Sequence, residues 1–231
     1  MRGVEFVPSG DFGADIKILE QLVECIKVDF ILIPSNPLGK PSVDPLVSAK
    51  MIQDALGVGV VATIRGGERD EGEILSRLKG VCYANLLGIA CVSGDGYIRG
   101  VDAMRILELA SSFDLRFKIT TLTNLEAKIS KGATHAISQP IFTPSYALRE
   151  SIPIFANFMP IFAHETFGKI DANKEILGFS IPLEYQHSSN LMEANVELLQ
   201  ALLEQYVYLY LTPLQLSKQM PYLKELFANV K

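Results

Sequence analysis

A carboxylate at the end of a buried strand is the first feature of this sequence that suggests chemistry. Asp95 follows the apolar run 87–92 and stands between Gly94 and Gly96. A near-continuous apolar run is typical of a parallel strand covered on both faces, and flanking glycines let the chain turn so that the acid points away from the core. Ligands bind at that edge in α/β proteins, so we expect Asp95 to face a ligand. The alternative is that Asp95 only caps a helix that starts near Val101.

Two further polar residues lie within apolar strand patterns. Glu5 lies inside the segment Val4–Pro8, where an acid is costly unless it is paired or used. Gln139 interrupts the otherwise apolar segment 136–142, and its amide has the donors and the acceptor needed to bind the edge of a ring such as a flavin or a pterin. Internal hydrogen bonding is the alternative for Gln139. Two acids in different environments, as with Glu5 and Asp95, are typical of sites that transfer protons.

Several common site motifs are absent or misplaced. The histidines His135, His164 and His187 show no zinc-ligand spacing, so we expect no metal site and structural or surface roles for all of them. The sequence has no GxxxxGK[ST] phosphate loop and no GxSxG elbow. Residues 57–62 have the spacing of a dinucleotide-binding loop, but a helix precedes them and a strand follows, which is the reverse of the order that such a loop needs.

The composition indicates a globular protein that works away from membranes and nucleic acids. Net charge is −5 and the basic residues are scattered, so a surface that follows phosphates is not expected. No apolar run approaches the length of a membrane span, and the N-terminus does not read as a secretory signal. Cys25, Cys82 and Cys91 form no CxxC pair, which fits a reducing compartment, and we expect them to be small core residues. We therefore expect a cytoplasmic protein.

A regular alternation of strand and helix patterns must position these residues. Strand patterns occur at 4–8, 28–34, 58–64, 87–92, 117–122, 135–140, 153–159 and 206–212. Helical patterns occur at 15–27, 43–56, 71–79, 101–111, 124–131 and 190–205, with a helical turn at 145–150 and a last helix that begins at Thr212-Pro213. This alternation predicts an α/β fold, a (β/α)8 TIM barrel, with an open doubly wound sheet as the alternative. No linker interrupts it, so we expect a single domain, 1–231, whose rim brings Glu5, Asp95 and Gln139 to one site.

Four segments together resemble the methylenetetrahydrofolate reductase family. They are Val4-Glu-Phe-Val-Pro8, the strand that ends in Ser-Gly94-Asp95, the segment 131–142 that contains Gln139, and Leu177-Gly-Phe-Ser-Ile-Pro182. The family has Phe-Glu-Phe-Phe-Pro, Arg-Gly-Asp, Gly-Ala before a Thr-Gln-Phe-Phe-type strand, and Gly-Val-x-Ile-Pro at these places. The segments follow the family's order over essentially the whole chain.

The resemblance implies a flavin enzyme in which reduced FAD passes a hydride to methylenetetrahydrofolate to give methyltetrahydrofolate, with NADH or NADPH as the donor. Glu5 would be the general acid that protonates the folate nitrogen, a role that suits a carboxyl whose pKa is raised by burial. Asp95 would lie near the flavin and the pterin. Gln139 would bind the folate or the flavin ring, and Phe142 would contact the folate.

The flavin contacts of the family are only partly present. Gly94 and Asp95 keep the ring end of that site, and Asn124 and Lys128 match positions that contact FAD in the family. Elsewhere the sequence departs from the family: Thr63 and Ser93 stand at the places of a histidine and an arginine, and 212–214 replace a Leu-Asn-Arg segment. The Tyr-Pro-Glu-x-His-Pro loop that embraces FAD after the fifth strand is missing.

These departures leave two functions open. One is a reductase on folate or a related pterin, with FAD bound weakly or not at all, or with FMN. The other is a flavin-free folate- or pterin-binding barrel that serves a methyl-transfer partner without redox chemistry. A homo-oligomer, or a protein partner in one-carbon metabolism, also stays open.

Overall fold

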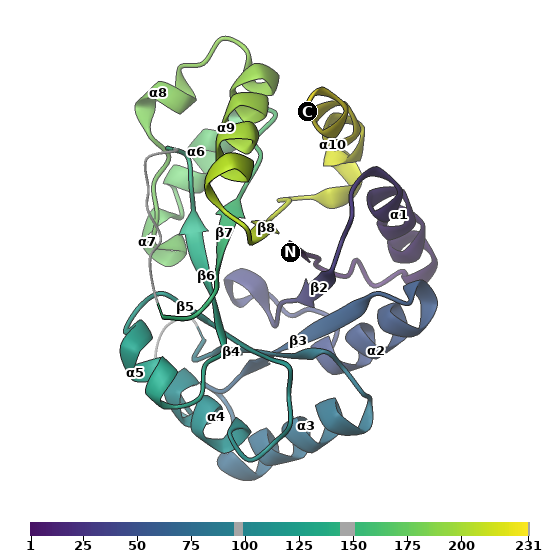
Figure 1. The fold of residues 1–231 in the computed structure, drawn as a ribbon, viewed down its shortest axis with the longest axis vertical. Helices are drawn as coiled ribbons and strands as arrows, with labels where there is room; N and C mark the ends of the chain where they lie inside the picture. Colours follow the sequence, from purple (N-terminus) through teal and green to yellow (C-terminus); the bar gives the residue numbers. More distant parts are fainter. Residues whose placement is uncertain (95–98, 144–150, 231) are drawn as a thin grey trace.

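Eight parallel strands close into a barrel, with every strand paired to the next and β8 paired to β1 (Figure 1). The computed structural model describes residues 1–94, 99–143 and 151–230. The strands are β1 (Arg2–Glu5), β2 (Phe30–Ile33), β3 (Gly59–Arg65), β4 (Gly88–Val92), β5 (Phe117–Thr121), β6 (His135–Pro140), β7 (Ile154–Phe158) and β8 (Leu209–Leu211). The (β/α)8 prediction is confirmed, and the open sheet is excluded because the barrel is closed.

Helices follow the strands and surround the barrel (Figure 1). They are α1 (Phe12–Cys25), the 3-10 turn η1 (Pro37–Gly39), α2 (Pro45–Leu56), α3 (Glu71–Tyr83), α4 (Ala103–Ala110), α5 (Leu125–Ser130), α6 (Glu165–Asp171), α7 (Lys174–Leu177), α8 (Leu183–Gln186), α9 (Leu191–Gln205) and α10 (Leu216–Asn229). Asp or Asn side chains accept backbone N–H bonds at the starts of α1, α2, α3, α4 and α9. Asp102 caps the start of helix α4, which is the role that the alternative interpretation gave to Asp95.

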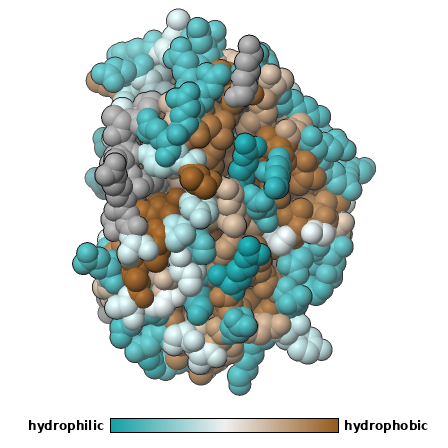
Figure 2. Space-filling model, in the orientation of Figure 1, coloured by the Kyte–Doolittle hydropathy of each residue, from teal (hydrophilic) through white to brown (hydrophobic). Residues whose placement is uncertain are grey.

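The core has two layers. Aromatic rings fill the barrel interior, where the Phe30 ring centroid lies 5.3 Å from that of Phe117 and 5.1 Å from that of Phe155. Aliphatic side chains fill the second layer, between strands and helices. In the view of Figure 2, polar residues cover most of the periphery and hydrophobic side chains show mainly toward the middle. Among the described residues, none of the helices has the length and apolar content that a membrane span requires.

Three sequence predictions are wrong in detail. Strand β1 ends at Glu5, so this acid lies at the strand's carboxyl end and not inside the strand. The last helix begins at Leu216 and not at Thr212, because Thr212 is buried and its hydroxyl donates to Asn157 instead of capping a helix. Cys82 is exposed on α3, although Cys91 is a core residue as expected. The helical turn expected at 145–150 lies outside the described residues, as does Asp95.

Candidate functional site

A large cavity opens at the carboxyl ends of the strands. Its volume is about 670 Å³, and all eight strands contribute to its lining. This size lies within the range of pockets that enclose drug-sized ligands, roughly 300–1,000 Å³. The carboxyl-end face is also where TIM-barrel enzymes carry their active sites. We therefore take this cavity as the candidate site.

Glu5 lies at the wall of this cavity as a carboxyl group that burial makes reluctant to ionise. Removal of water from around the carboxylate raises the pKa of Glu5, and a hydrogen bond from Tyr210 opposes that rise only partly. The Tyr210 hydroxyl donates to Glu5 Oε2 over 3.2 Å. Burial, and then the neighbouring Glu5 carboxylate, raise the pKa of Tyr210 as well, so the phenol keeps its proton and remains a donor. The pair is suited to hold a proton and to release it to a ligand.

Gln139 also lines the cavity, and its amide is open to the site. The side chain is exposed, and within 1–94, 99–143 and 151–230 its amide makes no hydrogen bond to the protein. Gly178 lies beside it, since a Cβ at that position would lie 3.4 Å from Gln139 Nε2, at van der Waals distance. The amide therefore has donors and an acceptor available for a ligand ring.

Phe142 does not line the cavity. It is buried, with its ring centroid 5.1 Å from that of Tyr185 and 6.2 Å from that of Phe179. Phe179 itself lies in the cavity wall, so Phe142 supports the wall from behind. Contact between Phe142 and a substrate stays a prediction.

Polar side chains from β7 and β8 complete the interior of the site. Asn157 and Thr212 are buried, both line the cavity, and the Thr212 hydroxyl donates to Asn157 Oδ1 over 2.8 Å. Sequence reasoning missed these two residues and Tyr210. The signal for Asn157 was available, because it interrupts the apolar strand 154–158 as Gln139 interrupts β6.

The side of the cavity next to β5 and α5 carries a positive charge. Lys128 is buried, its Nζ donates to Thr121 Oγ1 over 2.9 Å, and burial lowers its pKa. No carboxylate of the described chain lies within ion-pair distance of this amine. Asn124 lies at the start of α5 with its side chain exposed and not used as a cap. An anionic ligand group would therefore find one cationic donor and one amide here.

Gly94 lies in the cavity wall just after β4, the strand that pairs with β5. Its φ of 114° is in the region that favours glycine, and a Cβ there would lie 3.0 Å from Arg65 Nε. Arg65 is buried and donates to Glu68 Oε1 over 2.7 Å, so its charge is already compensated. Glu5 and Gln139 thus share one cavity, as the rim hypothesis requires of them, and Gly94, Asn124 and Lys128 line the same cavity. Asp95, the third residue of that hypothesis, lies outside the described residues.

The charged donors of this cavity fit a single anionic group better than a dinucleotide diphosphate. Lys128 offers one partly desolvated cation, whereas Arg65 is paired within the protein. Gly94, Asn124 and Lys128, which the family resemblance assigns to flavin binding, all line the cavity.

The described residues contain no group of three metal-ligating side chains, and two of the histidines have structural surroundings. His135 lies against the Phe117 ring inside the barrel, at 4.5 Å between centroids, and burial lowers its pKa. His164 Nε2 lies 3.0 Å from the Ser188 carbonyl oxygen.

Comparison with known proteins supports the fold and leaves the family open. No family model matches the chain, and no curated protein matches its sequence. Among solved structures, the chain is similar to an uncharacterized protein from Clostridium thermocellum that binds two copies of 5-methyl-5,6,7,8-tetrahydrofolic acid. That match has a TM-score of 0.68 and 14% identity, and it covers 98% of this chain and 94% of the other. The chain also resembles 2,3-dimethylmalate lyase, a member of the PEP mutase/isocitrate lyase superfamily, with a TM-score of 0.51, 12% identity, and coverage of 78% and 73%. These identities show a shared fold alone.

Proposed function

We propose that this chain binds a reduced folate at the carboxyl-end mouth of its barrel and reduces methylenetetrahydrofolate to methyltetrahydrofolate. The observation that carries the proposal is the Glu5 carboxyl, which burial keeps protonatable within a cavity of ligand size. Two facts support the choice of folate. Sequence segments around Glu5 and Gln139 resemble methylenetetrahydrofolate reductase, and a barrel of the same fold binds methyltetrahydrofolate.

In this proposal Glu5 is the general acid. The methylene carbon of the substrate bridges two nitrogens, and a proton from Glu5 to one of them lets that carbon–nitrogen bond open. The remaining iminium carbon then accepts a hydride and becomes the methyl group. A carboxyl with a raised pKa is suited to this step because it is still protonated when the substrate binds. Gln139 binds the pterin edge, and Tyr210 holds the acid in place.

A reduced flavin, when bound, supplies the hydride, and NADH or NADPH supplies the electrons to it. We propose that Gly94 and Asp95 lie at its ring and Asn124 and Lys128 at its phosphate. FAD is then held weakly, because in the part of the chain that the structure describes Lys128 is the one cation of the cavity wall that makes no ion pair.

Binding of 5-methyltetrahydrofolate, followed by calorimetry, tests the first part of the proposal. Wild type should bind it, and Gln139→Met should weaken binding by about ten- to a hundredfold, since a lost hydrogen bond in a desolvated site costs about 1–3 kcal/mol. Gln205→Met, at the exposed end of α9, is the matched control and should bind like wild type. Absence of binding, or equal affinity of Gln139→Met and wild type, would refute the folate site.

Substitution of the acid tests the second part. Glu5→Gln should keep folate affinity and lose reduction by roughly 10²–10⁴-fold, the usual contribution of general acid catalysis. A loss below about tenfold would mean that Glu5 is structural. Folate binding without reduction in wild type, with FAD, FMN and either nicotinamide supplied, would favour the flavin-free barrel that serves a methyl-transfer partner.

A further inference from the structure

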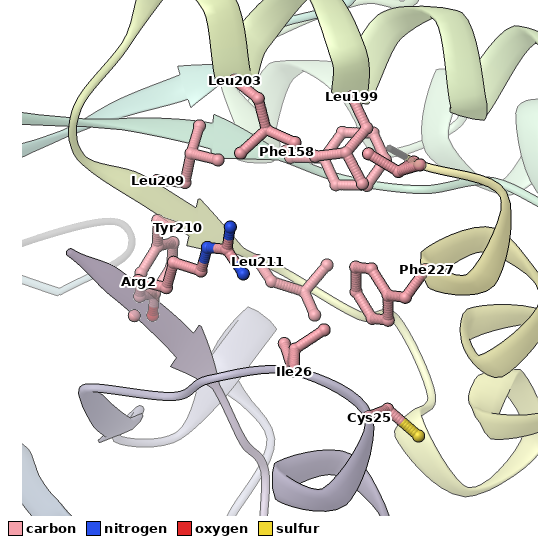
Figure 3. A pocket seen from close by; sticks show the side chains of 12 residues that line it. Arg2, Cys25, Ile26, Phe158, Leu199, Leu203, Leu209, Tyr210, Leu211 and Phe227 are labelled. Atoms are coloured by element: carbon pink, nitrogen blue, oxygen red, sulfur yellow. The ribbon is translucent and has the colours of Figure 1, made fainter.

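A second, smaller cavity lies outside the barrel wall, between the outer faces of β1, β7 and β8 and the helices α1, α9 and α10 (Figure 3). Its volume is about 180 Å³. Apolar side chains form most of its wall, among them Ile26, Phe158, Leu199, Leu203, Leu211 and Phe227. Of the described residues that line this smaller cavity, only Tyr210 also lines the large cavity at the carboxyl ends of the strands.

Arg2 is an exposed residue that lines this cavity and places a positive charge at the edge of its apolar wall. The next residue, Gly3, faces the barrel interior, since a Cβ there would lie 2.2 Å from Phe30 Cζ. Side chains alternate along a strand, so Arg2 faces outward, on the helix side of the barrel wall, where it stays exposed to solvent. Figure 3 shows its guanidinium between Leu209 and Leu211, over the cavity.

The guanidinium has no acidic partner in the described part of the chain. Asp29 accepts a hydrogen bond from the Arg2 backbone N–H over 2.7 Å and lies 3.9 Å from Lys27 Nζ, but it does not pair with the Arg2 side chain. A guanidinium is the side chain best suited to bind a carboxylate through two parallel hydrogen bonds. Its place at the edge of an apolar cavity therefore favours a ligand with one carboxylate and an apolar body.

The volume sets the size of that body. Apolar cavities of about 150 Å³ lined by Leu, Ile and Phe stay dry and bind benzene in other proteins. The present cavity is slightly larger and similarly lined. We propose that it is a binding site for a small monocarboxylate whose apolar part is the size of one ring or a six-carbon chain, with the tail among the leucines and the carboxylate on Arg2.

Cys25 offers a local readout, because it lies in the cavity wall and is partly exposed. Cys82 is exposed elsewhere and Cys91 is buried, so a Cys82→Ser background leaves Cys25 as the accessible thiol among the three. In that background, hexanoate at millimolar concentrations should slow the reaction of Cys25 with a thiol reagent by at least about tenfold at saturation. The concentration dependence gives its Kd, and hexan-1-ol serves as the neutral probe of equal length.

Arg2→Met keeps an unbranched apolar stem and removes the charge. This substitution should weaken the binding of hexanoate by at least about tenfold and change the Kd of hexan-1-ol by less than about threefold. Lys79→Met, which removes an exposed charge on α3, is the matched control and should leave both affinities unchanged. Leu203→Phe and, independently, Leu199→Phe should fill the cavity and abolish protection by both probes, with circular dichroism reporting whether each variant folds.

Three results would overturn the proposal. Hexanoate that fails to protect Cys25 shows that the cavity takes no such ligand. Equal weakening of hexanoate and hexan-1-ol by Arg2→Met, or no weakening, shows that Arg2 does not bind the carboxylate. Protection that persists in a folded cavity-filling variant places the ligand elsewhere.

Discussion

At the scale of single residues, the raised pKa of Glu5 predicts how stability depends on pH. The folded protein holds this proton more tightly than the unfolded chain, so stability from Glu5 is fully present below the ordinary pKa of 4.5 and is lost as pH rises through the raised value. The glutamine of Glu5→Gln cannot ionise, so this variant does not lose that stability as pH rises. We expect wild type to become progressively less stable relative to Glu5→Gln as pH rises from below 4.5 toward neutrality. Urea unfolding of both proteins over a pH series measures the difference, and parallel curves would contradict the pKa shift.

Tyr210 has a separate, measurable effect on the same acid. Its hydrogen bond lowers the pKa of Glu5 against the larger effect of burial, so Tyr210→Phe should raise that pKa further. Under the proposed function, the limb of the pH–rate profile that reports Glu5 should move to higher pH while folate affinity changes less than about threefold. The carboxyl carbon resonance of Glu5 reports the same shift without catalysis. Tyr208→Phe makes the same change in the barrel interior without a bond to Glu5 and should leave both readouts in place.

Sequence reasoning predicted Glu5 and Gln139 because each is a polar residue in an apolar strand pattern. It missed Tyr210 because a tyrosine in the alternating run 206–211 is typical of any half-buried strand. The contact that gives Tyr210 its role joins residues 205 positions apart, and it exists only because β8 closes the barrel against β1. Spacing along the chain carries no information about such a pair.

At the scale of elements, the strand predictions succeeded because strands buried on both faces have apolar runs that end in turn residues. The start of the last helix failed for a local reason: Thr212-Pro213 has the residues of a helix start, but the tertiary bond to Asn157 uses the threonine hydroxyl. Phe142 lies beyond a shift in the β6–β7 register between Ile137 and Pro140. The alternation of side chains along β6 therefore does not extend to it, and sequence could not tell whether it faced the cavity.

Gly3 on β1 packs so closely against Phe30 on β2 that a larger side chain at this position should destabilise the protein. Gly3→Ala would place a methyl group 2.2 Å from Phe30 Cζ, and Phe30 is fixed between Phe117 and Phe155. Overpacking of this kind lowers the free energy of unfolding by about 1–3 kcal/mol, and we expect Gly3→Ala to lower it by more than about 1 kcal/mol. Gly13→Ala, in the first turn of α1 where only Asp11 Oδ1 is near at 3.5 Å, should be neutral or slightly stabilising. Urea denaturation compares them, and a Gly3→Ala protein as stable as wild type would mean that β1 lies farther from Phe30.

At the scale of the whole molecule, the barrel gathers residues from β1, β6 and α5 around one cavity, and the charge in that cavity limits which anionic ligands it can bind. A doubly charged diphosphate needs charge-assisted donors, each worth about 1.5–3 kcal/mol. The loop that embraces FAD in the reductase family is missing after β5. Loss of two such donors would cost about 3–6 kcal/mol, or roughly two to four decades in affinity.

Among the described residues that line the cavity, Lys128 is a cation without an ion pair, whereas Arg65 is paired with Glu68. One cation suits the single phosphate of FMN as well as it suits half of the FAD diphosphate. We therefore predict that the apo-protein binds FAD and FMN with dissociation constants above about 1 μM that differ by less than about tenfold, as measured by flavin fluorescence.

Lys128→Met should weaken the binding of both flavins by about tenfold or more, since it removes the charge-assisted bond. Lys131→Met, at the end of the same helix but in an exposed ion pair with Glu108, should leave both affinities unchanged. Sub-micromolar FAD binding with a clear preference over FMN would mean that other residues replace the missing loop, and that the phosphate end of the site is built from more than Asn124 and Lys128.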